Sequence, residues 1–194
     1  TRSIWVTGVQ TCALPIMSRL ASEWRVIYLE EPVYDESAAF LETSQPVPGV
    51  LVCRAHTPVR APGFHDDQIP LLRRMLVELM LSEKIERYGV WFYTPMALPL
   101  VSELQPHVVV YDCMDELSAF LNAPRQLVQR ENALLKMATV VFIGGPSLYA
   151  AKRGRHPAVH CFPSSVDSAH FAQGRVGCIE HARQSPLQIG RAHV

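Results

Sequence analysis

The chain has no excess of charge, no long apolar run and no paired cysteine motif. Its 194 residues carry 18 basic and 18 acidic side chains, so the sequence favours no nucleic-acid or acidic partner. No run of 18 or more apolar residues occurs, which excludes a membrane-spanning helix of ordinary length. The five cysteines show no CxxC spacing and no histidines at zinc intervals. We therefore expect neither a metal centre nor a resident cofactor.

What remains is a chain of ordinary hydrophobic content, 48%, which can bury one core. Cys53, Cys113, Cys161 and Cys178 are interpreted as small apolar residues of a reducing compartment, and the sequence predicts a cytoplasmic location.

The two ends of the chain resemble translated DNA adapters rather than protein. Residues 188–194 back-translate as CAG ATC GGA AGA GCA CAC GTC, and the reverse complement of this DNA encodes nearly all of residues 10–16 in a shifted frame. We interpret residues 1–16 and 188–194 as artefacts and exclude them from fold reasoning. They should then bury little, and the genuine protein would span about residues 17–187 as a fragment cut at both ends.

Apolar runs and helical patterns alternate along residues 24–162, which predicts an α/β fold with a parallel sheet and helices on both faces. Strands are expected over 24–30, 50–54, 90–93, 107–111, 139–143 and 159–162, with loops around Pro58 and Pro62. The longest expected helix spans residues 69–88, with Asp67 as N-cap and Gly89 as its stop. Further helices are expected over 98–104, 116–121, 124–137 and 147–153.

Polar clusters follow several of the predicted strands, and in open α/β sheets ligands bind beyond the carboxyl ends of the strands. Because sequential parallel strands have right-handed crossovers, we expect the clusters at Tyr93–Thr94, Asp112 and Gly144–Ser147 to lie along one edge of the sheet. Gly144, Gly145 and Ser147 lie in a strand-to-helix turn that either faces a ligand or is an ordinary turn with Ser147 as N-cap. The spacing is not that of a dinucleotide-binding fingerprint. Asp112, Asp115 and Glu116 follow a buried strand and could bind sugar hydroxyls, with Asp112 favoured because it directly ends the strand. The alternative is that Asp112 or Asp115 caps the short helix over residues 116–121 while Glu116 is solvated.

Other polar residues have weaker claims. Tyr93 and Thr94, at a strand end, either line an acceptor pocket or form a plain turn before Pro95. Glu131 lies on the apolar stripe of its helix, which predicts a structural hydrogen bond to a neighbouring loop rather than catalysis. His107 and His156 are interpreted as incidental.

The segments YDCMDE (111–116), GGPSLY (144–149) and FPSSVD (162–167) resemble the N-terminal domain of bacterial GT-B glycosyltransferases. The segments WRVIYLEEPVYD (24–35) and WFYTPMALPL (91–100) resemble earlier strands of that domain. The resemblance covers about residues 17–172, so residues 173–187 would begin the linker to an absent C-terminal domain, and the first strand of the family would be missing.

This resemblance implies transfer of a sugar from a nucleoside diphosphate sugar to a saccharide or other small acceptor. The donor would bind the absent C-terminal domain, and acceptor-binding residues here would be Asp112, Tyr93, Thr94, Gly144, Gly145 and Ser147. No catalytic residue can be named, and the fragment should be inactive alone. The alternative is a non-catalytic α/β module that binds a small anionic or carbohydrate ligand.

Overall fold

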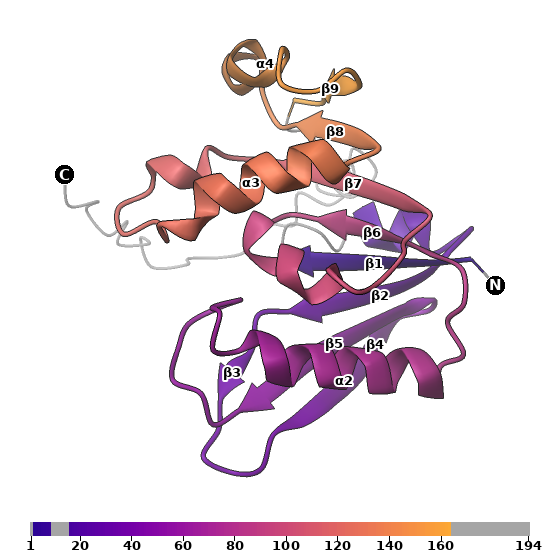
Figure 1. Ribbon diagram of the computed structural model, residues 1–194. Coiled ribbons are helices and arrows are strands. Elements are labelled where there is room, and N and C mark those ends of the chain that lie inside the picture. Colours follow the sequence, from indigo (N-terminus) through magenta and orange to yellow (C-terminus); the bar gives the residue numbers. More distant parts are fainter. Residues whose placement is uncertain (1, 9–15, 164–194) are drawn as a thin grey trace, which may run out of the picture. The chain divides into compact units, whose positions relative to one another are not determined.

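The structure is a computed structural model that describes residues 2–8 and 16–163. Nine strands of this part form one sheet in the order β3-β5-β2-β1-β6-β7-β8-β9, with β4 beside β5 (Figure 1). Every pair is parallel except β4–β5. The strands are β1 Ser3–Gly8, β2 Arg25–Glu30, β3 Val33–Tyr34, β4 Phe40–Val47, β5 Val50–Thr57, β6 Tyr88–Phe92, β7 Val108–Cys113, β8 Val140–Ile143 and β9 Val159–Cys161.

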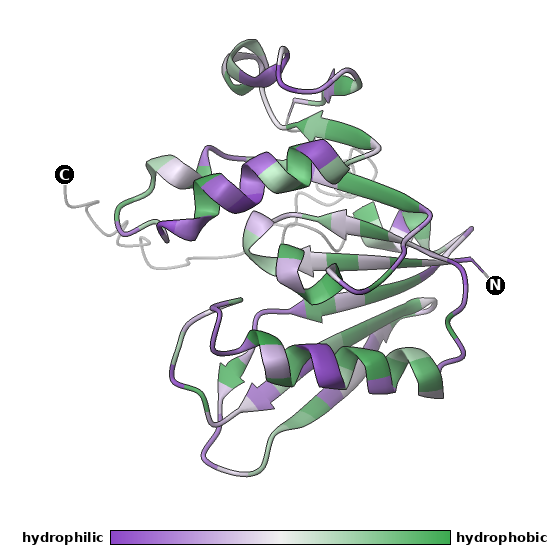
Figure 2. Cartoon of the chain, in the orientation of Figure 1, coloured by the Kyte–Doolittle hydropathy of each residue, from purple (hydrophilic) through white to green (hydrophobic). Residues whose placement is uncertain are grey.

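Helices pack on both faces of this sheet, as the sequence predicts. One face is covered by α2 (Ile69–Ser82), the 3-10 segment η1 (Pro95–Val101) and α3 (Gln126–Met137), which bury the larger apolar core. On the other face, residues 16–20 are helical, and Met17 is fully buried against Val6, Val26 and Tyr28. A second 3-10 turn, η2 (Leu117–Ala119), follows β7, and α4 (Pro146–Lys152) follows β8. The apolar colouring of the strands in Figure 2 agrees with this burial.

The alternation of side chains along β7 sends neighbouring residues to opposite faces. Val109, Tyr111 and Cys113 join the core beneath α3. Asp112, between them, points to the other face, because successive strand residues alternate. The side chains of Tyr111 and Asp112, which are consecutive in β7, therefore lie on opposite faces of the sheet.

The first strand corrects an expectation. Residues 1–16 were expected to bury little, yet Ser3–Gly8 forms β1, paired in parallel with both β2 and β6. Trp5 is 4% exposed and Val6 is fully buried. The expectation rested on the DNA that would encode these residues, whereas their apolar, β-branched character suits a central strand whatever its origin. The sheet therefore contains a strand before β2, whereas the sequence predicted that this first strand would be missing.

The adapter origin itself stays a prediction. Residues 188–194, the expected linker 173–187 and the segment 164–172 lie outside the described residues.

The longest helix is shorter than the sequence predicts. It ends at Ser82, and Lys84 adopts a positive φ of 52°, which helical residues do not adopt. Gly89 lies inside β6, where a Cβ would come within 3.3 Å of the Val108 carbonyl oxygen. The glycine therefore permits close strand packing instead of stopping a helix. Asp67 is not the N-cap either; Gln68 holds that position without a side-chain capping bond.

The buried side chain of Gln68 has another role. Its Oε1 accepts a 2.7 Å hydrogen bond from Thr57 Oγ1, and its Nε2 donates to the carbonyls of Val59 and Ala61. These bonds tie the proline-containing loop after β5 to the start of α2. The edge strand β4 was missed because it contains Pro46, at an irregularity between Ser44 and Val47, where proline is tolerated.

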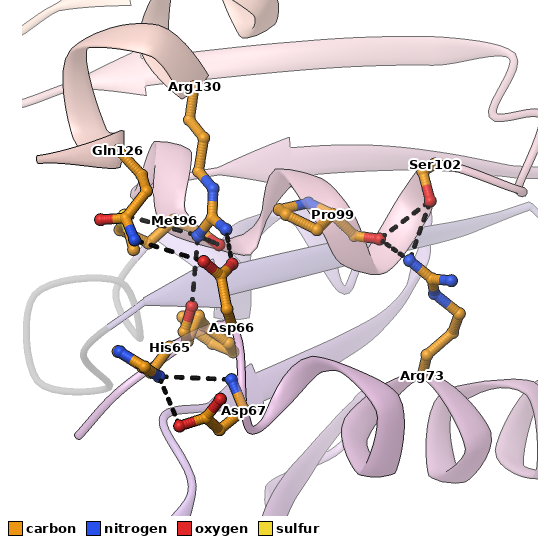
Figure 3. A network of polar contacts seen from close by, with 10 residues as sticks. His65, Asp66, Asp67, Arg73, Met96, Pro99, Ser102, Gln126 and Arg130 are labelled. Atoms are coloured by element: carbon orange, nitrogen blue, oxygen red, sulfur yellow. Dashed lines mark hydrogen bonds and ion pairs between the residues drawn. The ribbon is translucent and has the colours of Figure 1, made fainter. Parts of the chain in front are cut away.

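Arginine side chains hold η1 between α2 and α3 (Figure 3). Arg130 of α3 pairs with Asp66, in the loop before α2, and its Nη1 donates to the Met96 carbonyl at 3.1 Å. Arg73 of α2 donates to the Pro99 carbonyl at 2.7 Å. The segment that follows β6 is thus fixed from both sides.

Candidate functional site

The carboxyl ends of β6, β7 and β8 lie along one edge of the sheet. Phe92 pairs with Tyr111, and Cys113 pairs with Ile143, so the segments after these three parallel strands are neighbours. The strand order reverses between β1 and β6, the kind of position at which open α/β sheets bind ligands. The prediction that Tyr93–Thr94, Asp112 and the Gly144 turn share one edge is confirmed.

A pocket of about 400 Å³ lies at this edge, between the loop after β7 and helix α4. It brings together three of the expected residues, Gly144, Gly145 and Ser147, with two carboxylates that follow Asp112. Tyr93, Thr94 and Asp112 are not among its lining residues. The pocket, called the β7–α4 pocket below, is lined by Met114, Asp115, Glu116, Gly144, Gly145, Ser147, Leu148 and Ala151.

The two glycines of this turn differ in the space around their Cα atoms. A Cβ on Gly144 would come within 3.0 Å of the Met114 carbonyl oxygen, so the loop after β7 crosses directly against it. A Cβ on Gly145 would meet nothing within 4 Å. Gly145 is the N-cap of α4 and Pro146 its first residue, which makes the interpretation of Ser147 as the N-cap wrong.

Asp112 is a buried carboxyl, 8% exposed, on the face of β7 away from α3. Its Oδ2 accepts a 3.3 Å hydrogen bond from Trp91 Nε1. Burial raises the pKa of Asp112 to about 6, although hydrogen bonds from Trp91 and Tyr93, both neutral donors, act in the opposite direction. The capping alternative is wrong, because Glu116 is the N-cap of η2 and has no side-chain capping bond.

Trp91, a donor to this carboxyl, belongs to a cluster of aromatic rings. The Trp91 ring lies 6.3 Å from that of Tyr93 and 5.4 Å from that of Phe142, centroid to centroid. Thr94, one residue further on, caps η1 by accepting the Met96 amide at 3.3 Å. The bond before Pro95 is trans, since the described residues contain no cis peptide bond.

Glu131 lies at the centre of a buried ionic network on the α3 side. Its Oε1 accepts from Tyr111 Oη at 2.9 Å and from Lys152 Nζ at 2.6 Å, and its Oε2 accepts from Arg155 at 3.0 Å. The predicted structural role is confirmed: Arg155 donates from the loop between α4 and β9, and further bonds come from Tyr111 of β7 and Lys152 of α4. Sequence reasoning missed Lys152, which is 2% exposed.

Lys152 also pairs with Glu116, a lining residue of the pocket. Its Nζ lies 2.8 Å from Glu116 Oε2, and Ser118 Oγ donates to Glu116 Oε1 at 2.6 Å. The hydrogen bonds from Lys152 and Ser118 hold the pKa of Glu116 below its usual range. Burial alone would lower the pKa of Lys152, but its bonds to Glu116 and Glu131 raise it. Glu116 and Lys152 are therefore both ionised at neutral pH.

The structure also describes the cysteines and one of the histidines named in the sequence analysis. Cys53 and Cys113 are buried free thiols, whereas Cys161 is half-buried. His156 makes structural contacts: its Nε2 lies 3.0 Å from the Ala138 carbonyl, and its Nδ1 accepts the Ala158 amide. Across residues 2–8 and 16–163, no group of acidic, histidine or cysteine side chains could hold a metal ion. None of the helices in these ranges is long and apolar enough to cross a membrane.

No protein-family model matches the chain, and no curated protein matches it. Solved structures do. A sucrose-phosphate synthase from Thermosynechococcus elongatus matches with a TM-score of 0.66 and 11% identity, covering 86% of this chain and 49% of that chain. A trehalose-6-phosphate structure from E. coli bound with UDP-2-fluoro glucose gives 0.59 and 10%, covering 91% and 52%. A UDP-forming trehalose-phosphate synthase from Burkholderia xenovorans gives 0.55 and 12%, covering 90% and 50%.

The fold is Rossmann-like α/β. At these identities the likeness shows the fold alone, and the chain spans about half the length of these solved chains.

Proposed function

We propose that this chain is the acceptor-side domain of a GT-B glycosyltransferase, which transfers a sugar from a nucleoside diphosphate sugar to a small acceptor. One observation carries the proposal: the chain aligns over 86–91% of its length with about half of a sucrose-phosphate synthase, a trehalose-6-phosphate structure and a UDP-forming trehalose-phosphate synthase. The motifs after β7 and β8, which resemble that family, lie at the edge of the sheet where such folds bind ligands. The structure bound with UDP-2-fluoro glucose supports a nucleotide sugar as donor.

In this proposal, the residues of the described edge hold the acceptor rather than the donor. Carboxylates accept strong hydrogen bonds from hydroxyls, and the turn at Gly145 lets a ligand approach the backbone. Asp112, Tyr93, Thr94, Gly144, Gly145 and Ser147 remain the acceptor-binding candidates. Asp112 is the best of these, because a carboxyl whose pKa is raised at a sheet edge is a frequent mark of a functional site.

The donor would bind a second Rossmann-like domain, in the half of such a protein that lies outside the aligned part. Stabilisation of the leaving diphosphate by preorganised groups is worth roughly 3 kcal/mol per group removed. Without those groups the chain alone should not transfer sugar. A cytoplasmic location, suggested by the unpaired thiols of Cys53 and Cys113, belongs to the same proposal.

The test uses the uninterrupted gene, read from genomic DNA through both ends of this chain. The full parent and the present chain are each incubated with a panel of nucleotide sugars and candidate acceptors, and release of nucleoside diphosphate is measured. We expect acceptor-dependent release from the parent only. Transfer by the chain alone would contradict the two-domain argument.

The second candidate function is a stand-alone module that binds a carbohydrate or small anion without chemistry. A natural stop codon shortly after residue 172 in the genomic reading frame would favour it, together with ligand binding and no transfer. A frame that continues into a second Rossmann-like unit would favour the transferase.

A further inference from the structure

The β7–α4 pocket is acidic. Its lining includes two acidic residues, Asp115 and Glu116, together with Gly144, Gly145 and Ser147, and none of the described residues that line it is basic. Its volume, about 400 Å³, lies in the range of roughly 300–1,000 Å³ typical of small-molecule sites. The pocket is therefore large enough for one sugar ring and carries negative charge.

Glu116 is held in one orientation. Lys152 Nζ, 2.8 Å away, binds Oε2, and Ser118 Oγ, 2.6 Å away, binds Oε1. These bonds keep it ionised, and an ionised carboxylate only accepts hydrogen bonds. The side chain of Glu116 is 41% exposed, so its remaining lone pairs are open to a ligand that donates.

The positive charge of Lys152 is not open to a ligand. The side chain is 2% exposed and also binds Glu131 Oε1 at 2.6 Å. Glu131 and Glu116 together balance Lys152 and Arg155, so Asp115 leaves the surroundings of the pocket negative. A phosphate would meet like charge here, whereas hydroxyl groups would find acceptors.

We propose that the β7–α4 pocket binds a neutral, hydroxyl-bearing group of the acceptor and excludes a phosphate, and that Lys152 is the positioning residue that presents Glu116 to it. This inference rests on the proposed function, since it names the acceptor chemistry of that same edge. It assigns the selectivity to Glu116 and Asp115, which accept from the ligand, and the rigidity to a lysine that the ligand never touches.

The test measures equilibrium binding in the absence of any donor. NMR titrations monitor it through the backbone amide signals of Gly144 and Gly145. The probes are a panel of neutral methyl glycosides, the corresponding sugar 6-phosphates and inorganic phosphate. We expect a methyl glycoside to shift both glycine signals and its phosphorylated counterpart to bind at least about tenfold more weakly. Equal or tighter binding of a phosphate, or no glycine shift with any methyl glycoside, would overturn the proposal.

Glu116→Gln tests the accepting group. Loss of one charge-assisted hydrogen bond should weaken the neutral probe about tenfold. Glu78→Gln is the matched control, because it removes the same charge from an exposed site in α2 and should leave the affinity unchanged. Unchanged affinity in Glu116→Gln would contradict the assigned role.

The positioning role needs a variant that still folds. Lys152→Met combined with Glu131→Gln removes the buried cation and the buried anion together, which avoids an unpaired buried charge. The amide oxygen introduced by Glu131→Gln can still accept from Tyr111. We expect this double variant to lose affinity as Glu116→Gln does, whereas Glu131→Gln alone keeps the Lys152–Glu116 contact and most of the affinity. Equal affinity in the single and double variants would overturn the role of Lys152.

Because no donor is present, a negative result in these titrations counts against the pocket proposal alone. Failure of the parent to release nucleoside diphosphate would count against the proposed function alone.

Discussion

Tyr111 and Asp112 are neighbours in β7, yet their side chains enter opposite electrostatic environments. On the α3 side, Tyr111 donates to Glu131, which is 7% exposed and paired with two cations. On the other side, Asp112 is 8% exposed and accepts from the neutral indole of Trp91. The two carboxyls are almost equally buried. They differ in the charge of their partners.

The difference teaches that partner charge, rather than burial, decides what a buried carboxyl costs the fold. Glu131 is paired with the cations Lys152 and Arg155, whereas desolvation beside neutral donors raises the pKa of Asp112. The first arrangement holds α3, α4 and the loop after β7 together. The second leaves a group that changes charge near neutral pH at the candidate acceptor edge.

The largest expected effect concerns Trp5, in the central strand β1. Trp5→Ala should cost about 3–5 kcal/mol of unfolding free energy, because it empties a buried site in the core beneath α2. Chemical denaturation measures this loss. A loss below about 1 kcal/mol would show that the core does not depend on this residue and would strengthen the adapter interpretation of residues 1–16.

Removing the cation on the α3 side should cost nearly as much. Lys152→Met leaves Glu131 buried beside Arg155 alone and should lower the unfolding free energy by about 3–5 kcal/mol. Lys136→Met, at an exposed position in the last turn of α3, is the control and should change little. Equal effects of the two substitutions would break the comparison, since the network would then contribute nothing.

On the other side of β7, removing the charge should stabilise the fold. The folded-state pKa of Asp112 is raised from 3.8 to about 6, so the folded state binds this proton more tightly than the unfolded chain. The contribution of Asp112 is therefore most favourable below pH 3.8 and is lost as the pH rises through about 6.

Asp112→Asn should thus raise the unfolding free energy at pH 8 by up to about 3 kcal/mol and leave it almost unchanged at pH 4. Denaturation curves of both proteins at the two pH values measure this difference. In the parent, the same substitution should lower turnover if Asp112 binds the acceptor as a carboxylate. A variant less stable at pH 8 would contradict the raised pKa.

The smallest effect is expected for Tyr111→Phe, which removes one of the donors to Glu131 and leaves both cations. The loss should be about 1.5 kcal/mol, typical of a hydrogen bond to a charged group. Thermal unfolding resolves a change of this size. A loss as large as that of Lys152→Met would show that the Tyr111 hydroxyl contributes as much to the stability of the network as the Lys152 cation does.

Much of the fold follows from local sequence. Alternating apolar runs and helical patterns predict most of the strands from β2 to β9 and their shared polar edge, because parallel strands with right-handed connections place their carboxyl ends together. The turn at Gly144 and the paired state of Glu131 are also readable, the latter because a carboxylate on an apolar stripe must find partners.

Other features depend on the packed sheet and could not be predicted. Lys152 carries no local sign of burial; it becomes a core residue because α4 places it between Glu116 and Glu131. Asp115 and Glu116 line the pocket, whereas Asp112 does not. This follows from the alternation of side chains along β7 and from the close approach of the loop after β7 to Gly144. β1 was excluded on the origin of its codons, an argument that contains no information on packing.

The central claim is that the candidate acceptor edge holds a carboxyl, Asp112, whose ionisation is set by burial among neutral partners. Carboxyl-carbon NMR titration of the chain measures it directly, with Asp112→Asn identifying the signal. The account predicts a midpoint near 6 for Asp112 and one below the ordinary glutamate range for Glu116. A midpoint near 4 for Asp112, roughly the value of an exposed aspartate, would contradict it.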